Sequence, residues 1–162
     1  MATDTPTTTV PDIDADSVDE APAGSRILVA VSTARASQRM VDTVADLAAR
    51  LGAEVLVVNV RKPGGASQRT PDETADGNEA INTLGEQIRR RGARVQTLLM
   101  FSDDVARAIL STAEEQGATL ILLGLTGKGI VQRFFEGNVP LELIRETQIP
   151  VMLLPPNFDG VI

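Results

Sequence analysis

The chain of 162 residues contains no cysteine, histidine, tryptophan or tyrosine, and aromatic residues make up only 2% of it. Without cysteine there is no disulfide framework and no thiolate nucleophile, and without histidine zinc sites and imidazole acid–base catalysis are largely excluded. The length suits one domain, whose core must be built from aliphatic side chains.

The formal net charge of −7 is unevenly distributed along the chain. Residues 1–25 hold six of the 22 acidic residues and none of the 15 lysines and arginines, so the remainder has 16 acids against 15 bases, a net charge of −1. This Thr-, Pro- and Asp-rich segment has too little apolar surface to offset its ordering entropy, and we expect a disordered acidic tail over 1–25. It could act as a solubilising leader or as a partner-binding arm.

The sequence lacks a run of the roughly 18 apolar residues that a bilayer-spanning helix needs, and its N-terminus lacks the basic and apolar regions of a signal peptide. It also lacks a basic stripe interleaved with aromatic residues. We therefore expect a cytoplasmic protein without membrane insertion and without nucleic-acid binding.

From residue 26 onward, apolar runs alternate with segments of helical periodicity. Continuous runs such as RILVAVS and EVLVVNV are typical of strands buried on both faces of a parallel sheet. The predicted strands cover 26–32, 54–60, 94–100, 119–124 and 150–154. The predicted helices lie between them: one ends at the C-cap Gly52, one runs from a Thr70 cap to about Gly92 with Gly77 as its weakest point, one spans 104–116 with Ser102 or Asp103 as cap, and one spans 138–148.

Strict alternation of five strands with four helices predicts an α/β fold with a doubly wound parallel sheet. Ligands of such sheets gather outside the carboxyl ends of the strands, where the strand order reverses. For the order 3-2-1-4-5, that crevice lies between the first strand, which ends near Ser32, and the fourth, which ends at Gly124.

The stretch GLTGKGIVQRFFEGN opens at this point with glycines at 124, 127 and 137. Positions without Cβ let backbone N–H groups approach a polyphosphate closely, and the N-terminus of a helix starting at Asn138 adds its positive dipole end. Lys128 adds a nearby charge. The structural alternative is that Gly124 ends a buried strand, Gly127 and Gly129 make turns, and Gly137 starts a helix.

Residues 26–156 resemble a universal stress protein domain, and we assign 26–162 to it. That family carries the pattern G-x2-G-x9-G-[S/T] after its fourth strand, and Gly124, Gly127 and Gly137 match its spacing. The resemblance implies a five-stranded, Rossmann-like sheet of order 3-2-1-4-5, related to the adenine nucleotide alpha hydrolases. It also implies ATP as ligand, with Mg²⁺. The residues expected to bind it are Ser32, Val60, Gly124, Gly127, Lys128, Gly137 and Asn138.

The chain departs from the family pattern at three places. Ser32 stands where the family's ATP binders have an acidic residue, Asn138 stands where they have Ser or Thr, and Ser102-Asp103-Asp104 replaces a G-x-P. Two hypotheses therefore stay open. One is a stress-response regulatory protein that binds ATP or a related adenine nucleotide without efficient catalysis; the other is a dimeric protein that acts by protein–protein interaction, with a cleft that binds no nucleotide.

An enzyme is the weakest expectation. The loop STARAS after the first strand lacks the glycines of ATP pyrophosphatases and ligases, and Asp103 and Asp104 are only positional candidates for holding a metal. Both acids equally suit a solvated helix N-terminus. We expect no catalytic residue and no metal-binding side chain.

The last strand is short, apolar and bounded by prolines, and an edge strand leaves N–H and C=O groups unpaired. The resemblance implies a homodimer formed by antiparallel pairing of this strand through Val151, Met152, Leu153 and Leu154. The alternative is that the C-terminal residues PPNFDGVI fold over the edge. The protein partner, if the chain has one, is not identified by the sequence.

Overall fold

The computed structural model describes residues 24–63, 71–124, 139–155, 158 and 160. Strands and helices alternate along these ranges, as the sequence predicts. The strands are β1 (Arg26–Ala30), β2 (Glu54–Arg61), β3 (Val95–Phe101), β4 (Leu120–Gly124) and β5 (Val151–Leu154). The helices are α1 (Ala34–Leu51), α2 (Pro71–Arg90), α3 (Val105–Glu115) and α5 (Val139–Glu146).

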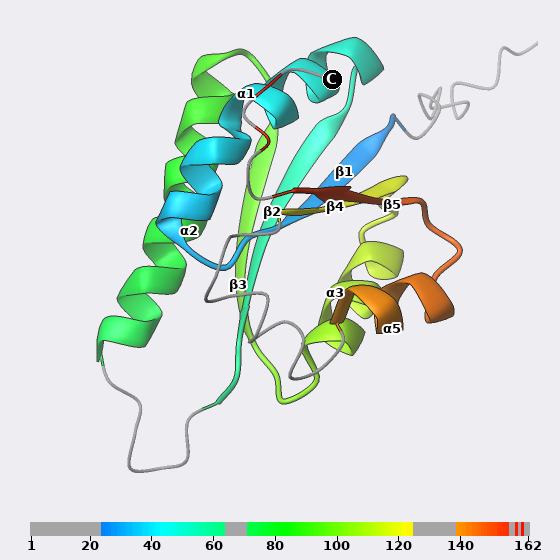
Figure 1. Ribbon diagram of the computed structural model, residues 1–162. Helices are drawn as coiled ribbons and strands as arrows, with labels where there is room; N and C mark the ends of the chain where they lie inside the picture. Colours follow the sequence, from blue (N-terminus) through cyan, green and yellow to red (C-terminus); the bar gives the residue numbers. More distant parts are fainter. Residues whose placement is uncertain (1–23, 64–70, 125–138, 156–157, 159, 161–162) are drawn as a thin grey trace, which may run out of the picture.

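The five strands form one parallel sheet in the order β3-β2-β1-β4-β5, which confirms the predicted topology (Figure 1). β1 is the central strand, and its last pair with β2 joins Ala30 to Val58. β2 and β3 stay paired as far as Arg61 and Phe101. The β2–β3 ladder therefore runs three residues beyond the last β1–β2 pair, on the side of the sheet order away from β4.

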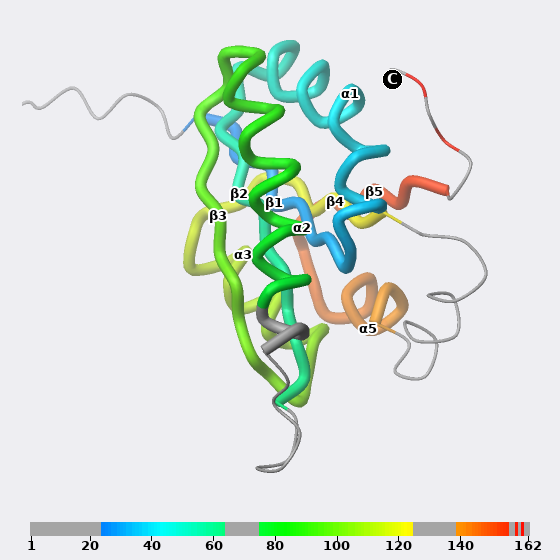
Figure 2. Tube along the Cα trace, turned by 90° about the vertical axis from the view of Figure 1, so that its left-hand side faces the viewer, coloured from blue at the N-terminus to red at the C-terminus, as the bar shows by residue number. Residues whose placement is uncertain are grey.

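Helices cover both faces of the sheet and divide the core into two clusters. α1 and α2 pack against each other on one face (Figure 2), where Met40, Val44, Leu84 and Ile88 are buried against the sheet. α3 and α5 cover the other face, and Ile109 and Leu143 are buried there. The residues that meet in these clusters are Val, Leu, Ile, Ala and Met, in agreement with the expected aliphatic core.

Helix α1 is capped at both ends. The Thr33 hydroxyl oxygen accepts a hydrogen bond from the N–H of Ala36 at 3.2 Å and caps the first turn. Gly52 has a φ of 59°, in the left-handed region that a C-cap glycine adopts readily. The predicted C-cap is confirmed, while the predicted Thr70 cap of α2 lies outside the described residues.

The N-cap of α3 corrects a prediction. Asp104, and neither Ser102 nor Asp103, caps the helix, because its extended backbone places the Oδ1 atom 2.9 Å from the N–H of Arg107. The Ser102 hydroxyl oxygen instead accepts the N–H of Asp104 at 3.2 Å and shapes the turn that precedes the helix. Ser102 is two residues too early to reach the orphan donors of the first turn.

Gly77 is the point at which α2 comes close to the sheet. A Cβ atom added there would lie 2.8 Å from Cδ1 of Leu99 and 2.9 Å from Oδ1 of Asn59. Real Cβ atoms do not approach other atoms so closely, so a glycine is needed for α2 to pack at this distance. The close packing is obtained although glycine has a low helix propensity. Gly77, the predicted weakest point of this helix, is therefore required for its packing against the sheet.

After β5 the chain passes toward α1. Phe158 packs against the cluster under α1 and α2, and the Thr43 hydroxyl on α1 donates a hydrogen bond to the Gly160 carbonyl oxygen at 2.7 Å. Gly160 accordingly lies beside α1. Every helix within the described ranges is too short or too polar to cross a membrane.

Candidate functional site

The strand order reverses between β1 and β4, and this places the candidate site outside their carboxyl ends. The last β1–β4 pair joins Ala30 to Leu123. Ser32 follows β1 by two residues, and Gly124 is the last residue of β4. The structure thus brings these two predicted site residues to neighbouring strand ends.

The Ser32 side chain is the unusual polar group at this position. Its Oγ atom is buried and has no hydrogen-bond partner among the described residues. Buried hydroxyl groups in proteins are nearly always paired. Ser37, one turn into α1, shows the usual arrangement, since its hydroxyl is within reach of the Ala80 carbonyl oxygen at 2.7 Å and the Thr33 carbonyl oxygen at 3.1 Å.

Two side chains of β2 hold the segment after β1 in place. Asn59, which is 1% exposed, donates from Nδ2 to the Val31 carbonyl oxygen at 2.7 Å and to the Ser32 carbonyl oxygen at 3.4 Å. The Oδ1 atom of Asn59 accepts a hydrogen bond from Nε of Arg61 at 2.9 Å. Nη2 of Arg61 donates to the Ser32 carbonyl oxygen at 3.4 Å.

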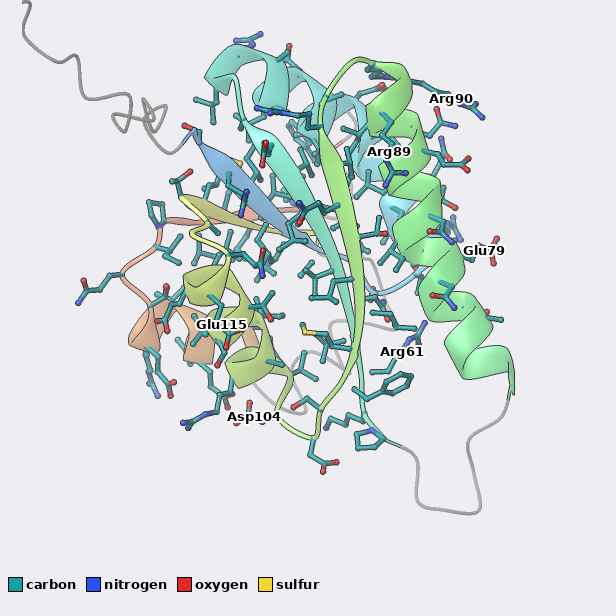
Figure 3. The ribbon with its side chains drawn as sticks, turned by 180° about the vertical axis from the view of Figure 1, so that it is seen from behind. Arg61, Glu79, Arg89, Arg90, Asp104 and Glu115 are labelled. Atoms are coloured by element: carbon teal, nitrogen blue, oxygen red, sulfur yellow. The ribbon has the colours of Figure 1, made fainter. Side chains whose placement is uncertain are left out.

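The Arg61 guanidinium group brings a positive charge to the crevice (Figure 3). It lies against the Ser32 backbone, at the position where the resemblance implies an acidic side chain. The local charge is therefore opposite in sign to the family pattern, and the region suits an anionic ligand group better than a cationic one.

Sequence reasoning did not single out Asn59 and Arg61. The available signal is Asn59 inside the otherwise apolar run VLVVNV, with Arg61 directly after that run. A buried asparagine in such a run must find hydrogen-bond partners, and here it finds them at the end of the neighbouring strand.

The predicted site residue Val60 points away from these groups. It packs against the cluster covered by α3 and α5, whereas alternate residues of a strand face opposite sides of the sheet. Its half-buried side chain can border the crevice only on the α3 side. Ser32 and Val60 flank the same strand ends, but the hydrogen-bond network joins Ser32 to Asn59 and Arg61 instead.

Gly124 has a packing reason of its own. A Cβ atom at this position would overlap Sδ of Met40, a core side chain of α1 that is 3% exposed. The structural alternative, a glycine required by the strand end, therefore holds for Gly124 whether or not a ligand is bound. The other predicted loop residues, Gly127, Lys128, Gly137 and Asn138, lie outside the described residues, and α5 begins directly after them at Val139.

The remaining acidic candidates do not gather with these groups. The Asp104 carboxylate caps α3, and Asp103 is exposed on the preceding turn. A cavity of about 440 Å³ lies at the opposite, amino-terminal end of the strands, lined by Arg26, Glu54 and Arg94 among others. It is separate from the crevice at the carboxyl ends.

Comparison with known proteins decides the family. The family model described as universal stress protein matches residues 25–155, which is most of the chain. The chain belongs to the universal stress protein family. The match confirms the resemblance to this family, and the observed strand order confirms the fold that the resemblance implies.

Solved universal stress proteins share the fold. The protein from Archaeoglobus fulgidus in complex with dAMP is 23% identical, with a TM-score of 0.61, over 82% of this chain and 98% of that one. A universal stress protein in complex with cAMP is 18% identical, with a TM-score of 0.62, over 86% of this chain and 100% of that one. A family protein from Burkholderia pseudomallei is 25% identical, with a TM-score of 0.63, over 82% and 97%.

A curated relative is much longer. The sensor protein KdpD of Mycobacterium tuberculosis (strain CDC 1551 / Oshkosh) is 26% identical over 125 residues, which are 77% of this chain. The matched region is only 14% of that relative. This universal stress protein domain therefore corresponds to one small part of the sensor.

Proposed function

We propose that this chain is a cytoplasmic stress-response regulatory protein that binds ATP, or a related adenine nucleotide, between the carboxyl ends of β1 and β4. Family membership supports the stress-response role, and complexes of two relatives with dAMP and cAMP support the ligand class. The observation that carries the proposal is the buried Ser32 hydroxyl at the switch point, which has no partner among the residues that the structure describes. A ribose hydroxyl or a base nitrogen would satisfy it.

The phosphates would lie on the glycine-rich loop. In the proposal, backbone N–H groups of Gly127 and Gly137 and the side chains of Lys128 and Asn138 hold the phosphate oxygens, with the N-terminus of α5 behind them. Mg²⁺ would accompany ATP on its phosphates. The Arg61 guanidinium adds positive charge on the β2 side of the crevice.

Catalysis is not part of the proposed function. Hydrolysis needs a group that activates water, and the chain has no histidine or cysteine to do so. The Asp104 carboxylate already caps α3. Phosphate release from ATP should stay at the buffer rate, and a faster release that Asp103→Asn with Asp104→Asn abolishes would contradict this.

Thermal denaturation with added nucleotide tests the proposal. ATP with Mg²⁺ should raise the melting temperature, because a ligand that binds only the folded chain at 100 times its Kd adds about 2.7 kcal/mol of stability. Ser32→Ala should unfold no more easily than the parent in the absence of ligand, since its hydroxyl makes no hydrogen bond with a described residue, and should lose part of the nucleotide effect.

Ser37→Ala is the matched control for Ser32→Ala. It removes a buried hydroxyl that has acceptors on Thr33 and Ala80, so it should destabilise the unliganded chain and leave the nucleotide effect intact. Absence of any stabilisation of the parent at millimolar ATP, dAMP and cAMP would rule out nucleotide binding.

A second candidate function is protein–protein interaction as a homodimer with a cleft that binds no nucleotide. Three apolar side chains exposed on α5 and β5 favour it: Leu141, Ile144 and Leu153 are 44%, 52% and 37% exposed. Among the described residues β5 pairs only with β4, which leaves its outer edge available to a second copy. If no nucleotide raises the melting temperature and the chain forms a stable dimer, this candidate is favoured.

A further inference from the structure

A basic cavity lies at the amino-terminal ends of β1, β2 and β3, opposite the nucleotide crevice. It has a volume of about 440 Å³ and is lined by three arginines, Arg26, Arg89 and Arg94, and by one acid, Glu54. A smaller cavity of about 260 Å³ shares the segment 92–94 with it. Figure 3 shows Arg89 at this end of α2 and Arg61 near the other.

The arginines of the cavity outnumber its carboxylates. The Glu54 carboxylate is shared, since Oε2 lies 2.8 Å from Nη2 of Arg26 and Oε1 lies 3.0 Å from Nε of Arg94. Both arginines keep the pKa of Glu54 below its usual range, so the carboxylate stays charged at neutral pH. Arg89 donates to the Val95 carbonyl oxygen at 3.3 Å and has no carboxylate partner among the described residues. The lining thus carries a net charge of +2.

Other arginines at this end of the sheet are already neutralised. Arg91 pairs with Asp42, and Arg90 pairs with Glu86 at 3.8 Å. Among the described residues around the cavity, the excess positive charge consequently belongs to its lining, which has three guanidinium groups and one carboxylate. Planar guanidinium groups bind carboxylates and phosphates through paired N–H donors.

The acidic segment of the chain joins the body at the rim of this cavity. The N–H of Glu54 donates to the Ser25 carbonyl oxygen at 2.9 Å, so residue 25 lies directly beside a cavity residue. The preceding residues include Asp12, Asp14, Asp16, Asp19 and Glu20. Glu20 is six positions before Arg26, and six residues of extended chain reach about 20 Å.

We propose that the acidic segment 12–20 docks in the arginine cavity formed by Arg26, Arg89 and Arg94. Opposite charge and direct chain continuity select this occupant over an external anion, because a tethered segment is present at millimolar effective concentration. The carboxylates of the segment bind the guanidinium groups that Glu54 leaves unmatched.

A spin label tests the docking in the full-length chain. The chain has no cysteine, so Ala15→Cys carries the nitroxide at a single site. The NMR amide signals of Gly92, Ala93 and Gln96 should be broader when the label is oxidised than when it is reduced. The broadening should vanish in about 1 M salt, where the Debye length falls to about 3 Å.

Charge variants give the matched comparison. Arg89→Gln with Arg94→Gln should abolish the broadening while Arg26 still pairs with Glu54 and the other amide signals keep their positions. Arg107→Gln with Arg145→Gln removes the same charge from exposed positions on α3 and α5 and should leave it unchanged. Neutralising the five acids of 12–20 to Asn or Gln should also abolish it.

Several results would overturn the proposal. Broadening spread evenly over the domain, centred on the crevice, or persisting after the five acids are neutralised would each exclude this docking. Absence of broadening in the parent, together with a response of the cavity amides to inorganic phosphate, would assign the cavity to an external anion.

Discussion

The Nδ2 atom of Asn59 lies 2.7 Å from the carbonyl oxygen of Val31, and this hydrogen bond ties a β2 side chain to the residue that directly follows β1. β2 runs on past the end of β1, and the N–H of Val31 still donates to the Val58 carbonyl oxygen at 2.9 Å. The Asn59 amide adds a side-chain contact to this backbone pairing and also donates to the Ser32 carbonyl oxygen at 3.4 Å. The mouth of the proposed nucleotide site therefore depends on a side chain of β2, which lies two positions from β4 in the sheet order.

Replacement of this amide should loosen the fold. We expect Asn59→Ala to lower the free energy of unfolding by about 1–3 kcal/mol, because it leaves the buried Val31 carbonyl oxygen without its donor. Urea denaturation measures the change. Asn82→Ala, on the exposed side of α2, is the control and should stay within about 0.5 kcal/mol of the parent. Equal effects at both positions would contradict the role of Asn59.

Gly124 and Met40 should behave as a coupled pair. Gly124→Ala places a Cβ atom on Sδ of a core methionine, and we expect a loss of about 1–3 kcal/mol of stability from overpacking. Met40→Ala alone leaves a hole in the core and costs about 2–5 kcal/mol. The double variant should lose less than the sum of the two, since the new methyl group enters the space that the methionine vacates.

The control for this cycle is Gly24→Ala. Nothing lies within 4 Å of a Cβ atom built at that position, so the substitution should be close to neutral. Strict additivity of Gly124→Ala and Met40→Ala in a denaturation experiment would show that the two residues are not in contact. It would also return Gly124 to a purely ligand-related explanation.

The alternation of strands and helices and the C-terminal end of α1 could be predicted because they depend on local signals, while the strand order was implied by the family resemblance. Alternating β-branched runs and helical periodicity determine the parallel sheet, and Gly52 marks a left-handed C-cap by its type alone. The Asn59 contact could not be predicted, because it depends on how far β2 outruns β1, which is a matter of register. The contact between Gly124 and Met40 depends on where α1 crosses β4. This crossing cannot be predicted from the sequence pattern of either element alone.

The prediction of the α3 cap was wrong for a related reason. Ser102, Asp103 and Asp104 are all good N-cap residues, so composition could not choose among them. The backbone of Asp104 is the one that leaves the helix in an extended conformation and aims its carboxylate at the N–H of Arg107. A difference of one or two residues in the helix start separates the correct cap from the wrong ones.

Glu54 should make stability depend on pH. The hydrogen bond from Arg26 and the charge of Arg94 lower its pKa in the folded chain. The unfolded chain then binds more protons, so the contribution of Glu54 is complete above its ordinary pKa of about 4.3 and is lost as the pH falls through the lower folded pKa. The stability difference between the parent and Glu54→Gln should be constant from about pH 7 to pH 5.5 and shrink below about pH 4.

Denaturant unfolding at a series of pH values measures this difference. Glu86→Gln, which breaks an exposed pair at 3.8 Å between neighbouring turns of α2, is the control and should change stability little at neutral pH. A parent-to-Glu54→Gln difference that grows toward acid would have the wrong sign for a lowered pKa. That outcome would show that the arginines do not favour the charged form of Glu54.

The C-terminal segment should be held to α1 by one hydrogen bond. Thr43→Val keeps the shape of the side chain, which is 1% exposed, and removes the donor to the Gly160 carbonyl oxygen. We expect a loss of about 0.5–1.5 kcal/mol and faster proteolysis after β5. Thr112→Val is a comparison within a helix, since that hydroxyl donates to the Ala108 carbonyl oxygen one turn earlier and should leave the C-terminus protected.

The edge of β5 should decide the oligomeric state. The segment after β5 returns toward α1, where Phe158 and Gly160 make their contacts, and Leu153 stays 37% exposed. We expect light scattering to give twice the chain mass of 17.2 kDa, and Leu153→Lys to shift the protein to the single-chain mass, because charged residues on an edge strand oppose pairing. Leu51→Lys, at a 47% exposed position on α1, should leave the mass unchanged. A parent that is monomeric at micromolar concentration, or a Leu153→Lys variant that keeps the doubled mass, would exclude an interface at β5.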